Sequence, residues 1–196
     1  MKLDLVIAGV GGQGTVLASR ILAQAALNAG LLARTSEMIG MAQREGSVQS
    51  HVRIAGRGGP VIGAKTADVL IGFEPAEAQR GCGLLRDDGL MLVNTQAVRP
   101  VTVALGSSRY PEAEILEYLR RFPARTTLVD ASALAVRAGN FRTVNAVMLG
   151  MLAGAGILPF ESGEVLKVLL EMVPGKAREV NEQAYQLGMD ALQGAR

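Results

Sequence analysis

The 196-residue chain is poor in the residues that build disulfides, clusters and base-stacking surfaces. It has one cysteine, Cys82, and one histidine, His51, so it cannot assemble an internal disulfide, a structural zinc site or an iron–sulfur cluster alone. Tryptophan is absent, aromatic residues make up 4%, and the formal net charge is only +2. We therefore expect no metal site and no nucleic-acid partner.

Long hydrophobic runs are also missing. The most apolar stretch, residues 144–158, contains three glycines and is shorter than the roughly 20 residues that a membrane span needs. The opening MKLDLVIAG carries Asp4 inside a short apolar run, which favours a strand over a signal peptide. With 49% hydrophobic and 19% charged residues, the composition is globular. These features predict a cytoplasmic protein without membrane contact, and the single cysteine is consistent with that compartment.

The first forty residues read as strand, glycine turn, helix and strand. Residues 3–8 form a short apolar run, residues 15–29 are rich in helix formers, Gly30 can end that helix, and residues 31–36 can form the next strand. Such a βαβ opening is typical of an α/β fold.

The rest of the chain extends this pattern. In residues 48–54, Val48, Val52 and Ile54 alternate with polar residues, which predicts a half-exposed strand. Further strands are expected at 68–73, 89–94, 101–104 and 126–129, and helices at 74–85, 112–121 and 131–137, the last capped by Asp130. Three more helices are expected at about 143–155, 162–172 and 177–192.

These elements predict one domain over residues 1–196. We expect a Rossmann-like, open and mostly parallel sheet with a glycine-rich first turn at about 1–140, and packed C-terminal helices at about 141–196.

The GVGGQG segment, residues 9–14, fits the pattern G-x-G-x-x-G between a strand and a helix. Gly9 can allow the tight turn, Gly11 the approach of a phosphate, and Gly14 close packing of the helix on its strand. A helix N-terminus offers free N–H groups to an anion. We therefore predict a cofactor-binding loop of Gly9, Gly11, Gly12, Gln13 and Gly14.

The loop does not identify its ligand. A Walker lysine is missing, which argues against ATP hydrolysis. Glu37 follows Gly14 at a spacing near that of the acid that holds the ribose of NAD, so NAD stays open. A glycine turn that binds nothing stays open as well.

No set of side chains suggests a complete active site. His51 lies on the polar side of its strand, where an exposed position at a partner surface is favoured over acid–base or metal chemistry. Arg44, Arg53 and Arg57 form a loose basic patch that can meet a carboxylate, a phosphate or an acidic partner. We assign no catalytic residue to this chain and do not expect it to be an enzyme alone.

Several segments together resemble a known family: GVGGQG at 9–14, SEMIGMAQREGSVQSHVRI at 36–54, ADVLIGFEPAEA at 67–78 and NTQAV at 94–98. They are similar to the gamma domain of 2-oxoacid:ferredoxin oxidoreductases. YPEAEI at 110–115 and AGNFRTVNAVMLGML at 138–152 are most similar to the small (beta) subunit of indolepyruvate:ferredoxin oxidoreductase. The resemblance covers nearly the whole chain in the same order.

The resemblance implies a subunit of an enzyme that decarboxylates a 2-oxoacid oxidatively, forms an acyl-CoA and reduces ferredoxin. Thiamine diphosphate, Mg²⁺ and [4Fe–4S] clusters would belong to a large partner subunit, and this chain would hold none of them. Coenzyme A is a candidate ligand of the glycine loop. Arg44, Ser47, His51 and Arg53 would face the partner, and a homodimer through the C-terminal helices stays open.

Two positions depart from the family pattern E-x-H-G-M-A-Q-R-G-G. Ile39 replaces the histidine and Glu45 replaces a glycine, which changes the local charge by about one unit. The departures bear on which 2-oxoacid is the substrate. The alternatives to the subunit hypothesis are a free-standing NAD-dependent oxidoreductase and a structural or regulatory module.

Overall fold

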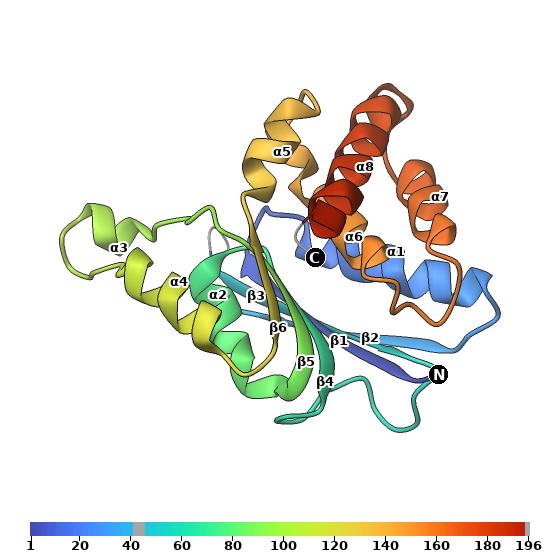
Figure 1. Cartoon of the computed structure of the whole chain (residues 1–196), viewed down its shortest axis with the longest axis horizontal. Coiled ribbons are helices and arrows are strands. Elements are labelled where there is room, and N and C mark those ends of the chain that lie inside the picture. Colours follow the sequence, from blue (N-terminus) through green and yellow to red (C-terminus); the bar gives the residue numbers. More distant parts are fainter. Residues whose placement is uncertain (41–45, 195–196) are drawn as a thin grey trace.

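A six-stranded sheet forms the centre of the molecule (Figure 1). The computed structural model describes residues 1–40 and 46–194. The strand order is β2-β3-β1-β4-β5-β6, and β3 is antiparallel to both of its neighbours while the other pairs are parallel. The strands are β1 (Leu3–Val10), β2 (Ala33–Ile39), β3 (Ser47–Ile54), β4 (Ala67–Gly72), β5 (Leu85–Asn94) and β6 (Arg125–Val129). The expected open, mostly parallel α/β fold is confirmed.

Helices cover both faces of the sheet. α1, α5, α6, α7 and α8 lie on one face, and α2 and α4 lie on the other, with α3 on an arm beyond them (Figure 1). The helices are α1 (Thr15–Asn28), α2 (Pro75–Gly81), α3 (Val101–Ala104), α4 (Glu112–Arg121), α5 (Ala131–Arg137), α6 (Val144–Gly154), α7 (Gly163–Met172) and α8 (Arg178–Gly194). Single 3-10 turns lie at Cys82–Leu84, Phe141–Thr143 and Gly175–Ala177.

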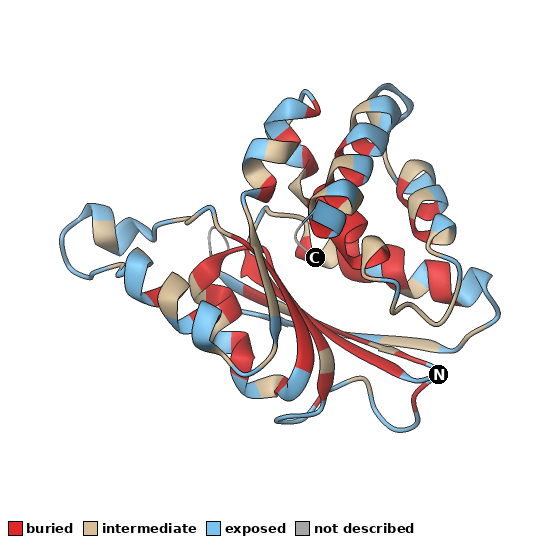
Figure 2. Ribbon diagram, in the orientation of Figure 1, coloured by how far each residue is buried: buried red, intermediate tan, exposed pale blue. Residues whose placement is uncertain are grey.

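The alternation of side chains along β1 builds a core on each face. Leu5 and Ile7 pack with α1 and α6, whereas Val6 and Ala8 pack with residues of α2 and α4. All of β1 is buried, and red buried strands run through the middle of the sheet in Figure 2. The uninterrupted apolar run at the start of the sequence thus reflects a strand covered on both sides.

Two C-terminal helices are held together by glycines. A Cβ on Gly150 of α6 would lie 2.0 Å from the backbone oxygen of Tyr185, and one on Gly188 of α8 would lie 2.0 Å from that of Val147. Of the glycines that interrupt the apolar stretch, Gly150 and Gly154 therefore lie where the backbones of α6 and α8 meet, whereas Gly156 does not. No helix in the described ranges is long and apolar enough to cross a membrane.

Most of the expected elements are present, and one is wrong. Residues 112–121 and 131–137 are helical as predicted, and Asp130 Oδ1 accepts a hydrogen bond from the Ala133 amide at 2.8 Å. Residues 101–104 were expected to be a strand but form α3. They begin after Pro100, and the Thr102 oxygen accepts bonds from the amides of the serines that follow, so the segment folds on itself instead of joining the sheet.

Candidate functional site

The glycine loop joins β1 to α1 at the carboxyl end of β1. Gly12 and Gly14 have φ angles of 93° and 84°, a region that side chains other than glycine rarely adopt. A Cβ on Gly9 would lie 2.8 Å from Thr15 Cγ2 and 2.9 Å from Phe73 Cβ, so the strand needs a glycine there for packing. The segment has the expected strand–turn–helix context, and ligand binding by it stays a prediction.

The side chain of Gln13 forms hydrogen bonds within the glycine loop. Its Oε1 accepts the Val10 amide at 2.9 Å, and its Nε2 donates to the Phe73 oxygen at 3.1 Å, so both ends of the side-chain amide are used within the protein. Gln13 therefore holds the loop in shape and ties β1 to the end of β4. Its backbone amide donates to the Val10 oxygen at 3.3 Å as well, so the predicted role of Gln13 as a direct cofactor contact has no free N–H donor at this residue.

The start of α1 offers unpaired donors. Among the described residues, no acceptor is present for the amides of Gly12, Gly14, Thr15 and Val16, whereas the Gly11 amide donates to the Gly46 oxygen at 2.9 Å. α1 has no side-chain cap and no acidic residue in its first turn. The helix N-terminus is therefore a region of positive potential without an internal anion.

The residues predicted to face a partner lie at different ends of β3. Ser47 pairs with Val10 beside the loop, and its hydroxyl donates to Glu77 Oε2 at 2.6 Å. Arg53 pairs with Asp4 at the opposite end of the strand. Arg44 and Glu45 lie outside the described residues. The structure thus brings Ser47, but not Arg53, to the glycine loop.

His51 is buried, so its expected exposure is wrong. Its Nδ1 accepts the Ile62 amide at 2.8 Å, because the segment between β3 and β4 folds back over the sheet. The ring proton therefore resides on Nε2, which lies 3.4 Å from Gln49 Oε1. Burial, and then the Arg53 charge, lower the pKa of His51 below its ordinary 6.5. His51 is a neutral structural residue, and its contact with a partner stays a prediction.

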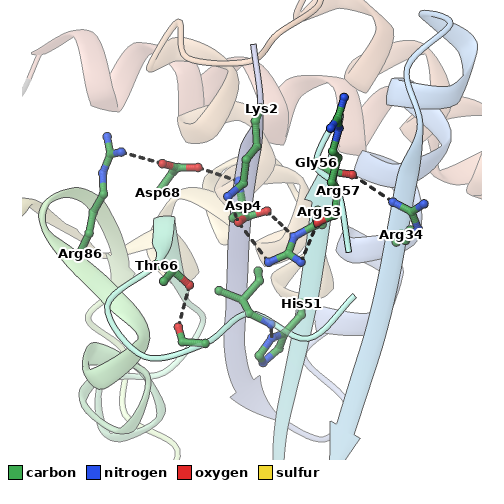
Figure 3. A network of polar contacts seen from close by, with 12 residues as sticks. Lys2, Asp4, Arg34, His51, Arg53, Gly56, Arg57, Thr66, Asp68 and Arg86 are labelled. Atoms are coloured by element: carbon green, nitrogen blue, oxygen red, sulfur yellow. Dashed lines mark hydrogen bonds and ion pairs between the residues drawn. The ribbon is translucent and has the colours of Figure 1, made fainter. Parts of the chain in front are cut away.

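Arg53 belongs to an internal ion-pair network (Figure 3). Its Nε donates to Oδ1 of the fully buried Asp4 at 2.9 Å, and its Nη1 donates to the Gly59 oxygen at 2.6 Å. Lys2 approaches the second Asp4 oxygen at 2.8 Å. The carboxylate that Arg53 meets is thus Asp4 of the same chain. Through its bond to the Gly59 oxygen, Arg53 also holds the segment between β3 and β4 over His51.

A cavity of about 510 Å³ opens beside the glycine loop at the carboxyl edge of the sheet. Ligands bind at this edge in open α/β folds. Its walls come from the loop, the segments after β5 and β6, α5 and the turn before α6, and include Gly12, Gln96, Asp130, Val136, Phe141 and Arg142. Apart from the loop, sequence reasoning gave none of these residues a ligand role, because they are distant in the chain and only the packing of α5 and α6 brings them together.

The position of Glu37 weakens the NAD hypothesis. β3 lies between β1 and β2, so Glu37 on β2 is two strands from the glycine loop, or about 10 Å by strand spacing alone. Glu37 also does not line the cavity. An acid that holds the ribose of NAD must lie on the strand next to the loop, and β3 takes that place here.

Glu74 is a buried residue that sequence reasoning did not single out as functional. Its Oε2 accepts the Glu77 amide at 2.9 Å and caps α2, while its Oε1 accepts the Tyr110 hydroxyl and the Val98 amide. Burial, and then Glu74 itself, raise the pKa of Tyr110. Glu74 therefore ties α2 to both ends of the arm that carries α3. Its position before Pro75 at a helix start was the available indication.

Comparisons with known proteins assign nearly the whole chain to one family. Residues 4–191 match the family model described as pyruvate ferredoxin/flavodoxin oxidoreductase. The indolepyruvate oxidoreductase subunit IorB of Archaeoglobus fulgidus is 41% identical over 96% of this chain and 94% of its own length. The pyruvate/ketoisovalerate oxidoreductases common subunit gamma of Pyrococcus furiosus is 29% identical over 90% of this chain and 89% of its own length.

Solved structures share the fold. The gamma subunit of a keto/oxoacid ferredoxin oxidoreductase from Geobacter sulfurreducens superposes with a TM-score of 0.73 at 24% identity, covering 98% of this chain and 99% of that one. A 2-oxoglutarate:ferredoxin oxidoreductase from Magnetococcus marinus superposes with a TM-score of 0.74 at 18% identity, covering 98% of this chain and 31% of the larger one.

Proposed function

Because the chain belongs to the pyruvate ferredoxin/flavodoxin oxidoreductase family, we propose that it is the small subunit of a 2-oxoacid:ferredoxin oxidoreductase. The reaction converts a 2-oxoacid and coenzyme A to an acyl-CoA and carbon dioxide, and two electrons pass to ferredoxin. The observation that carries this proposal is a match to small-subunit sequences over nearly the full length of both chains. We place the complex in the cytoplasm.

The chemistry of the reaction is assigned to a large partner subunit. Thiamine diphosphate with Mg²⁺ in that partner would supply the chemistry of decarboxylation, and [4Fe–4S] clusters there would supply electron transfer. This chain lacks suitable ligands for an iron–sulfur cluster, because its one cysteine, Cys82, is buried and burial raises the pKa of the thiol to about 11. The chain contributes a binding surface and no catalytic residue.

The glycine loop is proposed to hold a phosphate of coenzyme A. The amides at the start of α1 point to this role, because they lack internal acceptors and no acidic side chain neutralises the helix end. When coenzyme A is bound, it accepts the acyl group; the loop residues bind and orient its anionic part. An aryl 2-oxoacid such as indolepyruvate is the substrate that we favour, on the likeness to the IorB proteins.

The experiment that tests the subunit assignment is affinity purification of the tagged chain from its native host without oxygen. The eluate is assayed for coenzyme A-dependent dye reduction with indolepyruvate, pyruvate, 2-ketoisovalerate and 2-oxoglutarate. We expect an iron–sulfur partner to co-purify with activity on one 2-oxoacid class. A chain that elutes alone and inert from cells that contain the activity would overturn the proposal.

Two variants of Gly12 that differ in charge test whether the loop binds a phosphate. Gly12 is exposed, and a Cβ there meets nothing within 4 Å. Gly12→Asp and Gly12→Asn have similar shapes and share the backbone strain at a φ of 93°, so they differ mainly by one charge. We expect the KM for coenzyme A to rise about tenfold more in G12D than in G12N. Equal KM values in the two variants would contradict phosphate binding at the loop.

A further inference from the structure

The outer edge of β2 carries backbone groups without hydrogen-bond partners. β2 is the end strand of the sheet, so β3 is its one neighbour. The Gly40 amide donates to the Ser47 oxygen at 2.8 Å, and the Ala55 amide donates to the Leu32 oxygen at 2.7 Å, so the even-numbered residues of β2 bond to β3. The N–H and C=O groups of the odd-numbered residues therefore point away from β3, and none has a partner in residues 1–40 and 46–194. These residues are Ala33, Thr35, Glu37 and Ile39.

This edge lacks the features that usually prevent the addition of another strand. β2 contains no proline and no lysine, and it pairs with β3 over its whole length without a shift of register. Apolar side chains remain exposed at both ends of the edge: Leu32 is 53% and Met38 is 44% exposed. A straight edge with unpaired backbone groups and uncovered apolar side chains is suited to strand addition.

The sequence of β2 is complementary to itself when two copies run antiparallel about a two-fold axis at Thr35. Outward-pointing residues then face outward-pointing residues, so backbone hydrogen bonds form on both sides of the axis. Thr35 faces Thr35 of the second copy, and Leu32 faces Met38 at each end of the ladder, which covers both exposed apolar side chains. Glu37 and Arg34 do not face a like charge, because they lie opposite Ala33 and Ser36.

The neighbouring registers are less favourable. An axis at Glu37 places two carboxylates opposite each other, and an axis at Arg34 does the same with two guanidinium groups. An axis at Ser36 places Leu32 opposite Gly40 and Met38 opposite Arg34, so neither apolar side chain faces an apolar partner. With the axis at Thr35 the two Arg34 side chains are diagonal neighbours, and each is held within its own chain by a 3.0 Å hydrogen bond from Nη1 to the Gly56 oxygen (Figure 3).

We propose that β2 pairs with β2 of a second copy of this chain, antiparallel about a two-fold axis at Thr35, so that the two sheets become continuous. The Leu31 amide donates to the Ala26 oxygen within α1, so the new ladder ends at Leu32. Ile39 therefore lies outside the ladder and remains available to the large subunit. This surface is separate from the C-terminal helices, and the inference goes beyond the proposed function without resting on it.

The test is sedimentation equilibrium of the full-length chain from about 1 μM to about 1 mM. We expect the chain to associate to twice its mass of 20.5 kDa. Thr35→Glu and Thr35→Lys each place two like charges opposite each other on the axis, so each is expected to weaken dimer formation about tenfold. An equimolar mixture of T35E and T35K should restore the dimer, because the carboxylate of one chain then faces the ammonium group of the other. Recovery in the mixture also shows that both variants fold.

The matched controls are Gln183→Glu and Gln183→Lys, which make the same changes of charge at an exposed position of α8. Both should dimerise like the parent chain. Dissociation by the Gln183 variants would place the dimer at the C-terminal helices and overturn the inference. A parent chain that stays monomeric over the whole concentration range, or a mixture of T35E and T35K that does not dimerise, would overturn it as well.

Failure of this inference can be distinguished from failure of the proposed function. Sedimentation needs no partner subunit, so the dimer can be established even if no dye reduction is found. Conversely, an active complex whose small subunit is monomeric when purified alone would retain the proposed function and exclude the pairing of β2. If T35E then also lowered recovery of the large subunit in a pull-down, the free edge of β2 would belong to that partner instead of a second copy.

Discussion

At the scale of single residues, buried and half-buried polar side chains stabilise the structure and have no assigned role in chemistry. His51, Arg53 and Glu74 all satisfy their hydrogen bonds within the chain, and they hold the segment after β3 and the arm after β5 in place. Polarity in a strand pattern indicates which side faces away from the main core, but it does not reveal whether a loop covers that side. The alternation in β3 was read correctly, and the covering segment could not be foreseen from it.

His51 should make stability depend on pH near neutrality. Its pKa is lowered by folding, so the neutral form is favoured in the folded state; the stabilisation is complete above the ordinary pKa of 6.5 and is lost as the pH falls below it. We expect the free energy of unfolding in urea to fall between pH 7.5 and 5.5 in the parent chain. In His51→Gln the fall should be smaller, and since His51 is the only histidine, an equal fall would contradict this account.

Removal of the Glu74 carboxylate should destabilise the protein by about 3 kcal/mol, because a helix cap is lost and the Tyr110 hydroxyl and two amides lose their acceptor. Urea unfolding of Glu74→Ala measures this loss. Glu112→Ala is the control, since Glu112 forms an exposed ion pair with Arg99 and should change stability by less than about 0.5 kcal/mol. Similar losses in both variants would refute the assigned role.

At the scale of elements, hydrophobic pattern and capping residues were sufficient for most helices and parallel strands. Asp130 before α5 and the apolar run of β1 are local features, so the sequence alone placed these elements. The antiparallel position of β3 and the packing of Asn145 on Gly14 depend on which elements become neighbours. Neither follows from local propensity, and for this reason the cavity and its residues emerged only from the structure.

The contact between α6 and α8 should tolerate no side chain at Gly150. Alanine has the higher helix propensity by about 1 kcal/mol, but its Cβ would overlap the Tyr185 oxygen, so we expect Gly150→Ala to destabilise by about 3 kcal/mol. Thermal and urea unfolding measure the change. Gly163→Ala, at the start of α7 with open space around it, should be neutral or slightly stabilising. A stable G150A would mean that the two helices are not in backbone contact.

At the scale of the whole molecule, some large apolar side chains remain exposed at the ends of strands and helices. Ile39, at the end of β2, is 64% exposed, and Phe141 lies beside the cavity. Val61 is 59% exposed but belongs to the segment that covers the face of the sheet near His51. An exposed apolar side chain such as Ile39 on an edge strand is suited to contact with a partner.

We therefore expect Ile39→Asp to weaken assembly with the large subunit about tenfold or more, because it would bury a charge in an apolar contact. Val61→Asp, with a similar exposure, is the control and should assemble like the parent chain. Quantitative pull-down of the partner with each tagged variant measures the difference. Equal recovery with both variants would place the interface elsewhere.

The Gln13 side chain has a consequence for the speed of binding. Because its two hydrogen bonds hold the loop in shape, the ligand binding that we propose would require little ordering of the backbone and would cost little conformational entropy. A ligand can then associate at a rate set by diffusion and charge attraction, and differences in affinity between ligands will arise in their residence times. In a multi-subunit enzyme, a site of this kind can be refilled without waiting for a loop to close.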